Sequence, residues 1–180
     1  QLSEMMIRSG RVGSVELEKA LTIQEETGQV LTDILIEEQL ASSEDIALTF
    51  SELLNIPFLD LGEDFHLKRD EYNIIPESIA RRYGLIPLKK EDGVSITLVM
   101  KNPLDMDAVD TVRSLTSLEI HKAVSTEERI AIIIDKCYRE EAYVEAGLQD
   151  IIDLEAAESL GTIDADIGDV DQLLVHANDA

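Results

Sequence analysis

The first third of the chain contains an internal repeat. A shift of 29 residues brings one set of apolar positions in residues 1–62 onto a second set. Repeats of this length are typical of stacked supersecondary units. In each copy a short helix, 3–9 or 32–38, is expected to lead through a turn into a longer one, 14–26 or 43–54. The repeat therefore predicts two helical hairpins whose apolar side chains form a shared core. The superposed residues are Leu2 with Leu31, Met6 with Leu35, Ile7 with Ile36, Leu17 with Ile46 and Leu21 with Phe50.

Local signals mark where these helices begin and end. Ser42, followed three residues later by Asp45, resembles a capping box in which the shorter Asp replaces Glu. Gly28 occupies a position typical of a helix C-cap, where a left-handed backbone is needed. The boundaries of the hairpins are thus predicted independently of their apolar pattern.

Gln24 ends the apolar stripe of the first long helix. It shares one helix face with Leu17 and Leu21, at a spacing of four and then three residues. The two leucines are expected in the core. For the Gln24 amide two interpretations remain open, since it either reaches solvent or contacts a ligand.

Residues 63–139 switch to a mixed pattern. Residues 94–100 begin with an alternation of apolar and polar side chains and, with residues 85–88, predict a β-hairpin. The pattern predicts a small α/β sandwich with a three-stranded sheet that has one covered and one more open face. The expected elements are a helix that starts at residues 75–77 and stops at Gly84, strands 85–88 and 94–100, helix 105–115, strand 118–124 and a final helix through Tyr138 with Ile130, Ile133, Ile134 and Cys137 on its inner face.

Charge divides the chain into three blocks. Residues 1–62 carry 12 acidic and 3 basic side chains, residues 63–139 carry 14 and 12, and residues 140–180 carry 12 and none. Like charges with little apolar surface oppose packing, so the acidic tail is expected to be partly disordered. The predicted fold class is α+β, with a helical-hairpin repeat subdomain at 1–62, an α/β sandwich subdomain at 63–140 and an acidic linker at 141–180.

A linker and two short helical segments are predicted within the acidic tail. Residues 141–168 are interpreted as the linker proper, and residues 169–177 are expected to begin a helix. The start at Gln1 and the end at Ala180 predict that the sequence is a piece of a longer protein. A short helical turn is expected to hold Leu148, Ile151, Ile152 and Leu154.

Composition and motifs exclude several classes of function. A net charge of -23 argues against nucleic-acid binding, which draws on clustered cationic side chains. The sequence shows no phosphate-binding loop, no nucleophile elbow and no metal-ligand spacing among its three histidines and one cysteine. No segment reaches the roughly 20 apolar residues that span a bilayer. The expectation is a non-catalytic cytoplasmic chain without a metal.

Several segments carry a family resemblance. The repeat closes in I-P-F-L-D-L at residues 56–61, and residues 75–83 read I-P-E-S-I-A-R-R-Y. Residues 101–105 read K-N-P-L-D, which resembles the A-x-x-D-P-x-D segment of the family with Asn102 in place of Asp. Residues 1–140 thus resemble the amino-terminal domain of bacterial type II secretion and type IV pilus assembly ATPases of the GspE, PilB and MshE type. The ending Q-L-L-V-H-A-N-D-A is similar to the segment that leads into the motor portion.

The resemblance implies a non-catalytic regulatory or docking domain. It implies that ATP and Mg²⁺ are used by an absent motor domain beyond Ala180, and that this motor domain forms a hexamer. The implied partner is the cytoplasmic part of an inner-membrane platform protein, which places the chain in the cytoplasm, peripheral to the inner membrane. The resemblance leaves open whether the parent system secretes proteins or moves pili.

Some members of this family bind cyclic di-GMP through two copies of the motif R-L-G-x-x-L-x-x-x-G-x-L-x(4)-L-x(3)-L-x-x-Q. Here the first copy has Gln1 for Arg and Ser3 for Gly. The second copy has Val30 for Arg, Thr32 and Gln39 for the two glycines, and Leu53 for Gln. Losing Arg removes a guanidinium that stacks on a base and pairs with phosphate. The candidate ligand-binding residues that the resemblance implies are Leu2, Met6, Gly10, Leu17, Leu21, Gln24, Leu31 and Leu35.

Two functions follow as hypotheses. Docking is favoured because only one motif copy survives, and a two-part ligand held by one half-site should lose most of its affinity. The alternative is a cyclic di-GMP sensor, which calorimetry with that nucleotide distinguishes from docking. An enzyme acting alone would need a reactive constellation that the sequence does not contain.

Overall fold

The computed structural model describes residues 1–139, 147–149 and 151–156. The chain divides into two compact units, Gln1–Cys137 and Tyr138–Ala180. In the second unit, residues 147–149 and 151–156 are helical, as expected for a short turn there, and their side chains are exposed. The helix expected at residues 169–177 and most of the expected linker lie outside the described residues.

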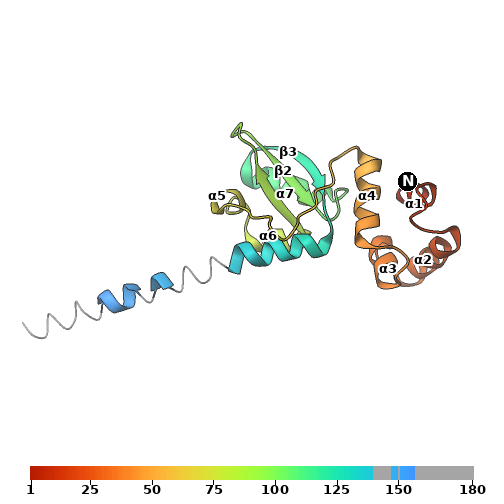
Figure 1. The fold of residues 1–180 in the computed structure, drawn as a ribbon, viewed down its shortest axis with the longest axis horizontal. Helices are drawn as coiled ribbons and strands as arrows, with labels where there is room; N and C mark the ends of the chain where they lie inside the picture. Colours follow the sequence, from red (N-terminus) through yellow and green to blue (C-terminus); the bar gives the residue numbers. More distant parts are fainter. Residues whose placement is uncertain (140–146, 150, 157–180) are drawn as a thin grey trace, which may run out of the picture. The chain divides into compact units, whose positions relative to one another are not determined.

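The repeat folds into four helices, as predicted. They are α1 (Leu2–Arg8), α2 (Ser14–Thr27), α3 (Leu31–Glu37) and α4 (Ser43–Leu54), and Figure 1 shows them as the red to orange end of the chain. Helix α1 contacts α4, and α2 contacts α3. Each helix therefore has contacts with a helix of the other copy, which interlocks the two hairpins into one body.

The turns inside the two hairpins have the same hydrogen bonds. The backbone N–H groups of Arg11 and Val12 both donate to the carbonyl of Met6, at 3.0 and 3.4 Å. Twenty-nine residues later, Leu40 and Ala41 donate in the same way to the carbonyl of Leu35, at 2.8 and 3.1 Å. The sequence repeat is thus also a repeat of backbone structure.

The predicted caps are present. The Ser42 hydroxyl accepts from the Asp45 N–H at 3.1 Å, and the Asp45 carboxylate accepts from the Ser42 N–H at 3.2 Å. Gly28 ends α2 with a left-handed φ of 72°. These groups satisfy backbone donors and acceptors that a helix end leaves without a partner.

One buried cluster fills the helical part. Its floor extends to the sheet, because Val124 at the end of the third strand belongs to the same cluster. Phe58, in the segment that follows α4, packs against it. The cluster comprises Met6, Val12, Leu17, Ala20, Ile34, Leu35, Ile46, Ala47, Phe50 and Val124.

The second half contains the predicted three-stranded sheet. Strand β1 (Leu85–Lys89) pairs antiparallel with β2 (Ser95–Met100), and β2 pairs parallel with β3 (Glu119–Val124). Helix α7 (Met106–Thr116) makes the crossover between the two parallel strands, which is the usual connection for that geometry. Helix α6 (Glu77–Tyr83) ends at Gly84, whose φ is 59°.

The two faces of the sheet differ, as expected. On one face Ile96, Leu98 and Met100 of β2 are fully buried in a cluster with Val109 and Val112 of α7. On the other face the aligned residues Ile86, Val99 and Ala123 are buried, whereas His121, two positions before Ala123, is exposed. This second face is therefore covered at one end and open at the other.

A short segment links the helical part to the sheet. The N–H of Leu59 donates to the carbonyl of Val124 at 2.9 Å, and the N–H of Val124 donates to the carbonyl of Pro57 at 3.0 Å. The helix at residues 127–139 then lies beside α6, since Asp135 pairs with Arg81 at 2.7 Å (Figure 1). The Ser43 hydroxyl at the start of α4 also donates to Glu128 at 2.6 Å.

One helix was not predicted. Helix α5 (Arg69–Tyr72) spans only one turn, and its start is fixed by the Glu71 carboxylate, which accepts from the Lys68 N–H at 2.8 Å. Four residues are too few to show a helical period. In the part of the chain that the structure describes, no helix combines the length and apolar character needed to cross a bilayer.

Candidate functional site

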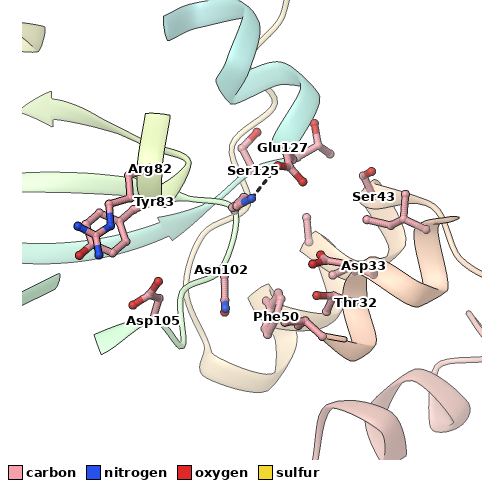
Figure 2. Close-up of a pocket in the computed structure, with 16 residues that line it drawn as sticks. Thr32, Asp33, Ser43, Phe50, Arg82, Tyr83, Asn102, Asp105, Ser125 and Glu127 are labelled. Atoms are coloured by element: carbon pink, nitrogen blue, oxygen red, sulfur yellow. Dashed lines mark hydrogen bonds and ion pairs between the residues drawn. The ribbon is translucent and has the colours of Figure 1, made fainter. Parts of the chain in front are cut away.

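A cleft of about 200 Å³ opens between the helical repeat and the α/β sandwich. One wall comes from α3 and α4, and the other from the end of α6, residues 101–105 and the start of the helix at 127–139 (Figure 2). The lining residues are Val30, Thr32, Asp33, Ile36, Ser43, Ile46, Ala47, Phe50, Arg82, Tyr83, Lys101, Asn102, Asp105, Ser125, Thr126 and Glu127.

The helical wall is largely apolar. Ile46, Ala47 and Phe50 are buried to within 5% exposure and belong to the core cluster, so the cleft opens directly onto the core. Val30 stands 55% exposed just before α3. The sandwich wall is polar, with Asn102 and Asp105 facing the opening in Figure 2.

The Lys101 side chain lines the cleft and has contacts at its charged end and along its stem. Its Nζ donates to the Glu127 carboxylate at 2.6 Å, and both residues are among the lining groups. Its aliphatic stem crosses Gly84, where an added Cβ would lie 2.6 Å from the Lys101 Cδ. Glycine at residue 84 therefore serves both the left-handed helix end and the passage of the lysine.

The other charged groups of the cleft are arranged differently. The guanidinium of Arg82 lies 5.2 Å from the centre of the Tyr83 ring, a cation–π geometry. Asp105 is the N-cap of α7, and its Oδ1 accepts from the Ala108 N–H at 3.0 Å. Asp33 lies exposed in the first turn of α3.

None of the eight predicted ligand-binding residues lines this cleft. Three of them, Met6, Leu17 and Leu35, lie in the buried core at 0, 4 and 0% exposure. Leu2 and Leu31 pack against that core. The expectation that Leu21 lies in the core with Leu17 is wrong, because Leu21 is 37% exposed whereas Leu17 is buried.

The two remaining candidates, Gly10 and Gln24, lie nearer the surface. Gly10 is exposed, and the Gln24 side chain is half-buried and donates to the Gln29 carbonyl at 3.2 Å. The eight predicted residues are therefore divided between the buried core and the surface of the helical part. Ligand binding by these residues stays a prediction.

The cleft is instead lined by positions where the second motif copy departs from the family pattern. Val30 and Thr32 hold the places of the motif Arg and of its first Gly, and both line the cleft. Ile46 and Phe50 hold two of the Leu places. These four residues are not among the predicted ligand-binding residues, which were those that keep the character of the motif. Their equivalence to motif positions in the repeat is the sequence signal that could have identified them.

A second depression, of about 260 Å³, is also lined by residues that differ from the motif. It is lined by Gln1, Glu4, Met5, Arg8 and Leu53. Gln1 holds the Arg place of the first copy, and Leu53 holds the Gln place of the second. Because α1 contacts α4, the start of one motif copy meets the end of the other, and here neither place keeps its motif residue.

An ion pair ties the turn after α1 to α4. The half-buried Arg11 guanidinium donates to both carboxylate oxygens of Glu52, at 2.9 and 2.7 Å. This bidentate hydrogen bond lowers the pKa of the Glu52 carboxyl below its usual value.

The chain has relatives among curated proteins. The chain is 23% identical over its whole length to the type IV pilus assembly ATPase PilB of Myxococcus xanthus. It is 27% identical over 77% of its length to the type II secretion system protein E of Xanthomonas campestris pv. campestris. It is 31% identical over 64% of its length to PilB of Thermus thermophilus. The chain covers 31, 25 and 13% of these relatives in that order, a minor part of each.

Solved structures show the same fold. A structure of MshE with cdg matches with a TM-score of 0.67 and 24% identity, covering 77% of this chain and 99% of that one. The amino-terminal domain of XpsE matches with a TM-score of 0.63 and 25% identity, covering 75 and 92%. The MshEN domain model matches residues 54–143. This confirms the resemblance inferred from the motifs: the chain belongs to the MshEN domain family, and its relatives include PilB pilus assembly ATPases and a type II secretion system protein E.

Proposed function

We propose that this chain is a non-catalytic docking domain of a secretion or pilus assembly ATPase. In this proposal it couples the motor to the cytoplasmic part of an inner-membrane platform protein, and ATP and Mg²⁺ act in a motor domain outside this sequence. The chain itself would then work in the cytoplasm, at the membrane surface. Support for the ATPase context comes from the relatives, three of which are named as pilus ATPases or a secretion protein E.

One observation is the main support for docking: both depressions are lined by residues of other types at places where the motif has Arg, Gly or Gln. Val30 stands where the motif has Arg, and it lies exposed at the edge of the larger cleft. An aliphatic side chain cannot pair with phosphate, but it can contribute apolar area to a protein interface. The net charge of -9 on residues 1–62 would also repel a dinucleotide and attract a basic protein surface.

The second candidate function is cyclic di-GMP sensing, which a solved structure of the same fold supports. The MshE structure of the same fold contains cdg, that is, cyclic di-GMP. The first motif copy here still has Gly10 and Gln24. If sensing is the function, Gln24→Ala should weaken nucleotide binding with little change in thermal stability, since the Gln24 side chain donates a local hydrogen bond to the Gln29 carbonyl and lies outside the buried core.

One pair of titrations separates the candidates. The chain is titrated by calorimetry with cyclic di-GMP, and separately with the cytoplasmic domain of the platform protein from the same organism. Docking predicts binding of the platform domain with an association rate that falls as salt rises, because charge steers the encounter. Micromolar or tighter binding of the nucleotide, lost in Gln24→Ala, would instead establish sensing.

A further inference from the structure

The cleft between α3, α4 and the sandwich combines an apolar floor with carboxylates on two walls. Ile46 and Phe50 form the floor, where they are 5 and 2% exposed. Asp33 lies on the helical wall and Asp105 on the sandwich wall, and Figure 2 shows them on opposite sides of the opening. A ligand that enters the cleft therefore meets apolar surface below and negative charge at both edges.

The two carboxylates differ from the cleft lysine in their partners, since Lys101 already pairs with a carboxylate. Among the described residues neither Asp33 nor Asp105 forms an ion pair, and Asp105 uses one oxygen as a helix cap. Lys101 is held by Glu127 at 2.6 Å, and the Arg82 guanidinium lies over the Tyr83 ring. The lining thus carries three carboxylates, Asp33, Asp105 and Glu127, against the two cations Arg82 and Lys101, and this net negative charge favours a cation over an anion.

The size of the cleft limits the occupant further. Its volume of about 200 Å³ lies below the roughly 300–1,000 Å³ of pockets that enclose drug-sized ligands. One long side chain is a better match than a whole dinucleotide. Arginine combines an aliphatic stem, which can lie on Ile46 and Phe50, with a planar fork that pairs with carboxylates.

We propose that this cleft is a docking pocket for a single arginine side chain of the partner protein, with its guanidinium between Asp33 and Asp105. This inference rests on the proposed docking function and specifies the chemistry of the contact. A buried arginine anchor at the centre of an interface is a common source of binding energy.

The first test uses a minimal probe. Nα-acetyl-arginine amide is titrated into the ¹⁵N-labelled 180-residue chain, and amide shifts are followed by NMR. We expect saturable shifts that cluster at Thr32, Asp33 and Asp105, and much smaller shifts with the norleucine analogue, which keeps the stem without the charge. Equal shifts with both probes, shifts located elsewhere, or the same shifts with inorganic phosphate would overturn the proposal.

The second test uses two isosteric changes. The double variant Asp33→Asn, Asp105→Asn removes both charges, and Asn keeps the N-cap of α7. The matched control is Asp107→Asn, which changes an exposed carboxylate of the same helix that does not line the cleft. We expect the double variant to bind the platform domain about tenfold more weakly or worse, while the control binds as the wild type does. Thermal unfolding of each variant checks that it is folded.

The outcomes distinguish this inference from the function on which it rests. If the platform domain binds the double variant as tightly as the wild type, docking stands and the arginine pocket is wrong. If the platform domain does not bind the wild type at all, the proposed function is wrong, and the probe titration alone then decides whether the cleft is an arginine site.

Discussion

Gly10 and Gln39 hold the same place in the two copies of the repeat, and both have a left-handed backbone, with φ angles of 70° and 55°. Each lies in the turn between the short and the long helix of its hairpin. The second copy thus has the same left-handed turn as the first, with Gln39 where the first copy has a glycine. Gln39 therefore carries a local conformational cost that Gly10 avoids.

Gln39→Gly should stabilise the chain. A left-handed residue with a Cβ costs about 1–2 kcal/mol, and glycine loses about 0.5–1 kcal/mol of extra chain entropy on folding, so the net gain should be about 0.5–1 kcal/mol. Urea denaturation measures the free energy of unfolding. The reciprocal change Gly10→Gln should destabilise by a similar amount, because an added Cβ there has no atom within 4 Å and only the backbone term acts. A loss of stability in Gln39→Gly would contradict this account.

Leu35→Ala and Leu21→Ala should differ sharply, although both are leucines of the motif. Leu35 is fully buried and Leu21 is 37% exposed. Truncating the buried side chain removes apolar contacts and leaves a cavity, which should cost about 2–5 kcal/mol, against less than about 1 kcal/mol for the exposed one. Chemical denaturation of both variants checks the difference, and equal losses would show that the motif positions are not divided into core and surface.

Gly84→Ala should destabilise the sandwich and displace Lys101. The new Cβ would lie 2.6 Å from the Lys101 Cδ, at a backbone φ of 59° that disfavours any side chain. We expect a loss of about 1–2 kcal/mol from the backbone alone. Gly62→Ala is the control, since a Cβ there has open space around it and its φ is not left-handed. NMR of the Lys101 side chain should report loss of the contact with Glu127 only in Gly84→Ala.

The contribution of the Arg11–Glu52 pair should depend on pH. Because the hydrogen bond from Arg11 lowers the folded-state pKa of Glu52 below its ordinary 4.5, the pair's stabilisation is present above that value. It is lost as the pH falls through the lowered pKa, when the carboxylate becomes protonated in the folded state too. The gap in unfolding free energy between the wild type and Glu52→Gln should therefore be widest near neutral pH and close in acid. A gap that widens as the pH falls would refute the assignment, and the variant Arg11→Met, Glu52→Gln should show no further pH-dependent gap relative to Arg11→Met.

The chain alone should hydrolyse no ATP. The sequence contains no phosphate-binding loop, and the γ-phosphate needs a backbone cradle and a lysine to hold it. Phosphate release is measured on the purified chain. Turnover that survives repurification and scales with the concentration of the chain would overturn both this prediction and the proposed non-catalytic role.

The sequence alone determined the helix boundaries of the repeat. The cap of Ser42 and Asp45, the left-handed Gly28, and the apolar spacing all act within a few residues. Signals of this kind are local, so they can be read without knowing the fold. The strands and the α7 crossover followed from the same kind of pattern.

Only the tertiary structure decided which helices pair and where the cleft lies. The pairing of α1 with α4 and of α2 with α3 depends on which faces bury the most apolar surface together, and many pairings share the same periodicity. Thr32 and Asp105 are far apart in the chain, yet both line the cleft. The hydrogen bonds of Pro57 and Leu59 with Val124 are among the long-range contacts that connect the helical part to the sheet. The motif identified equivalent positions in the two copies. Long-range packing decided that positions where the residue differs from the motif, such as Val30 and Thr32, line the cleft, whereas the eight predicted ligand-binding residues do not.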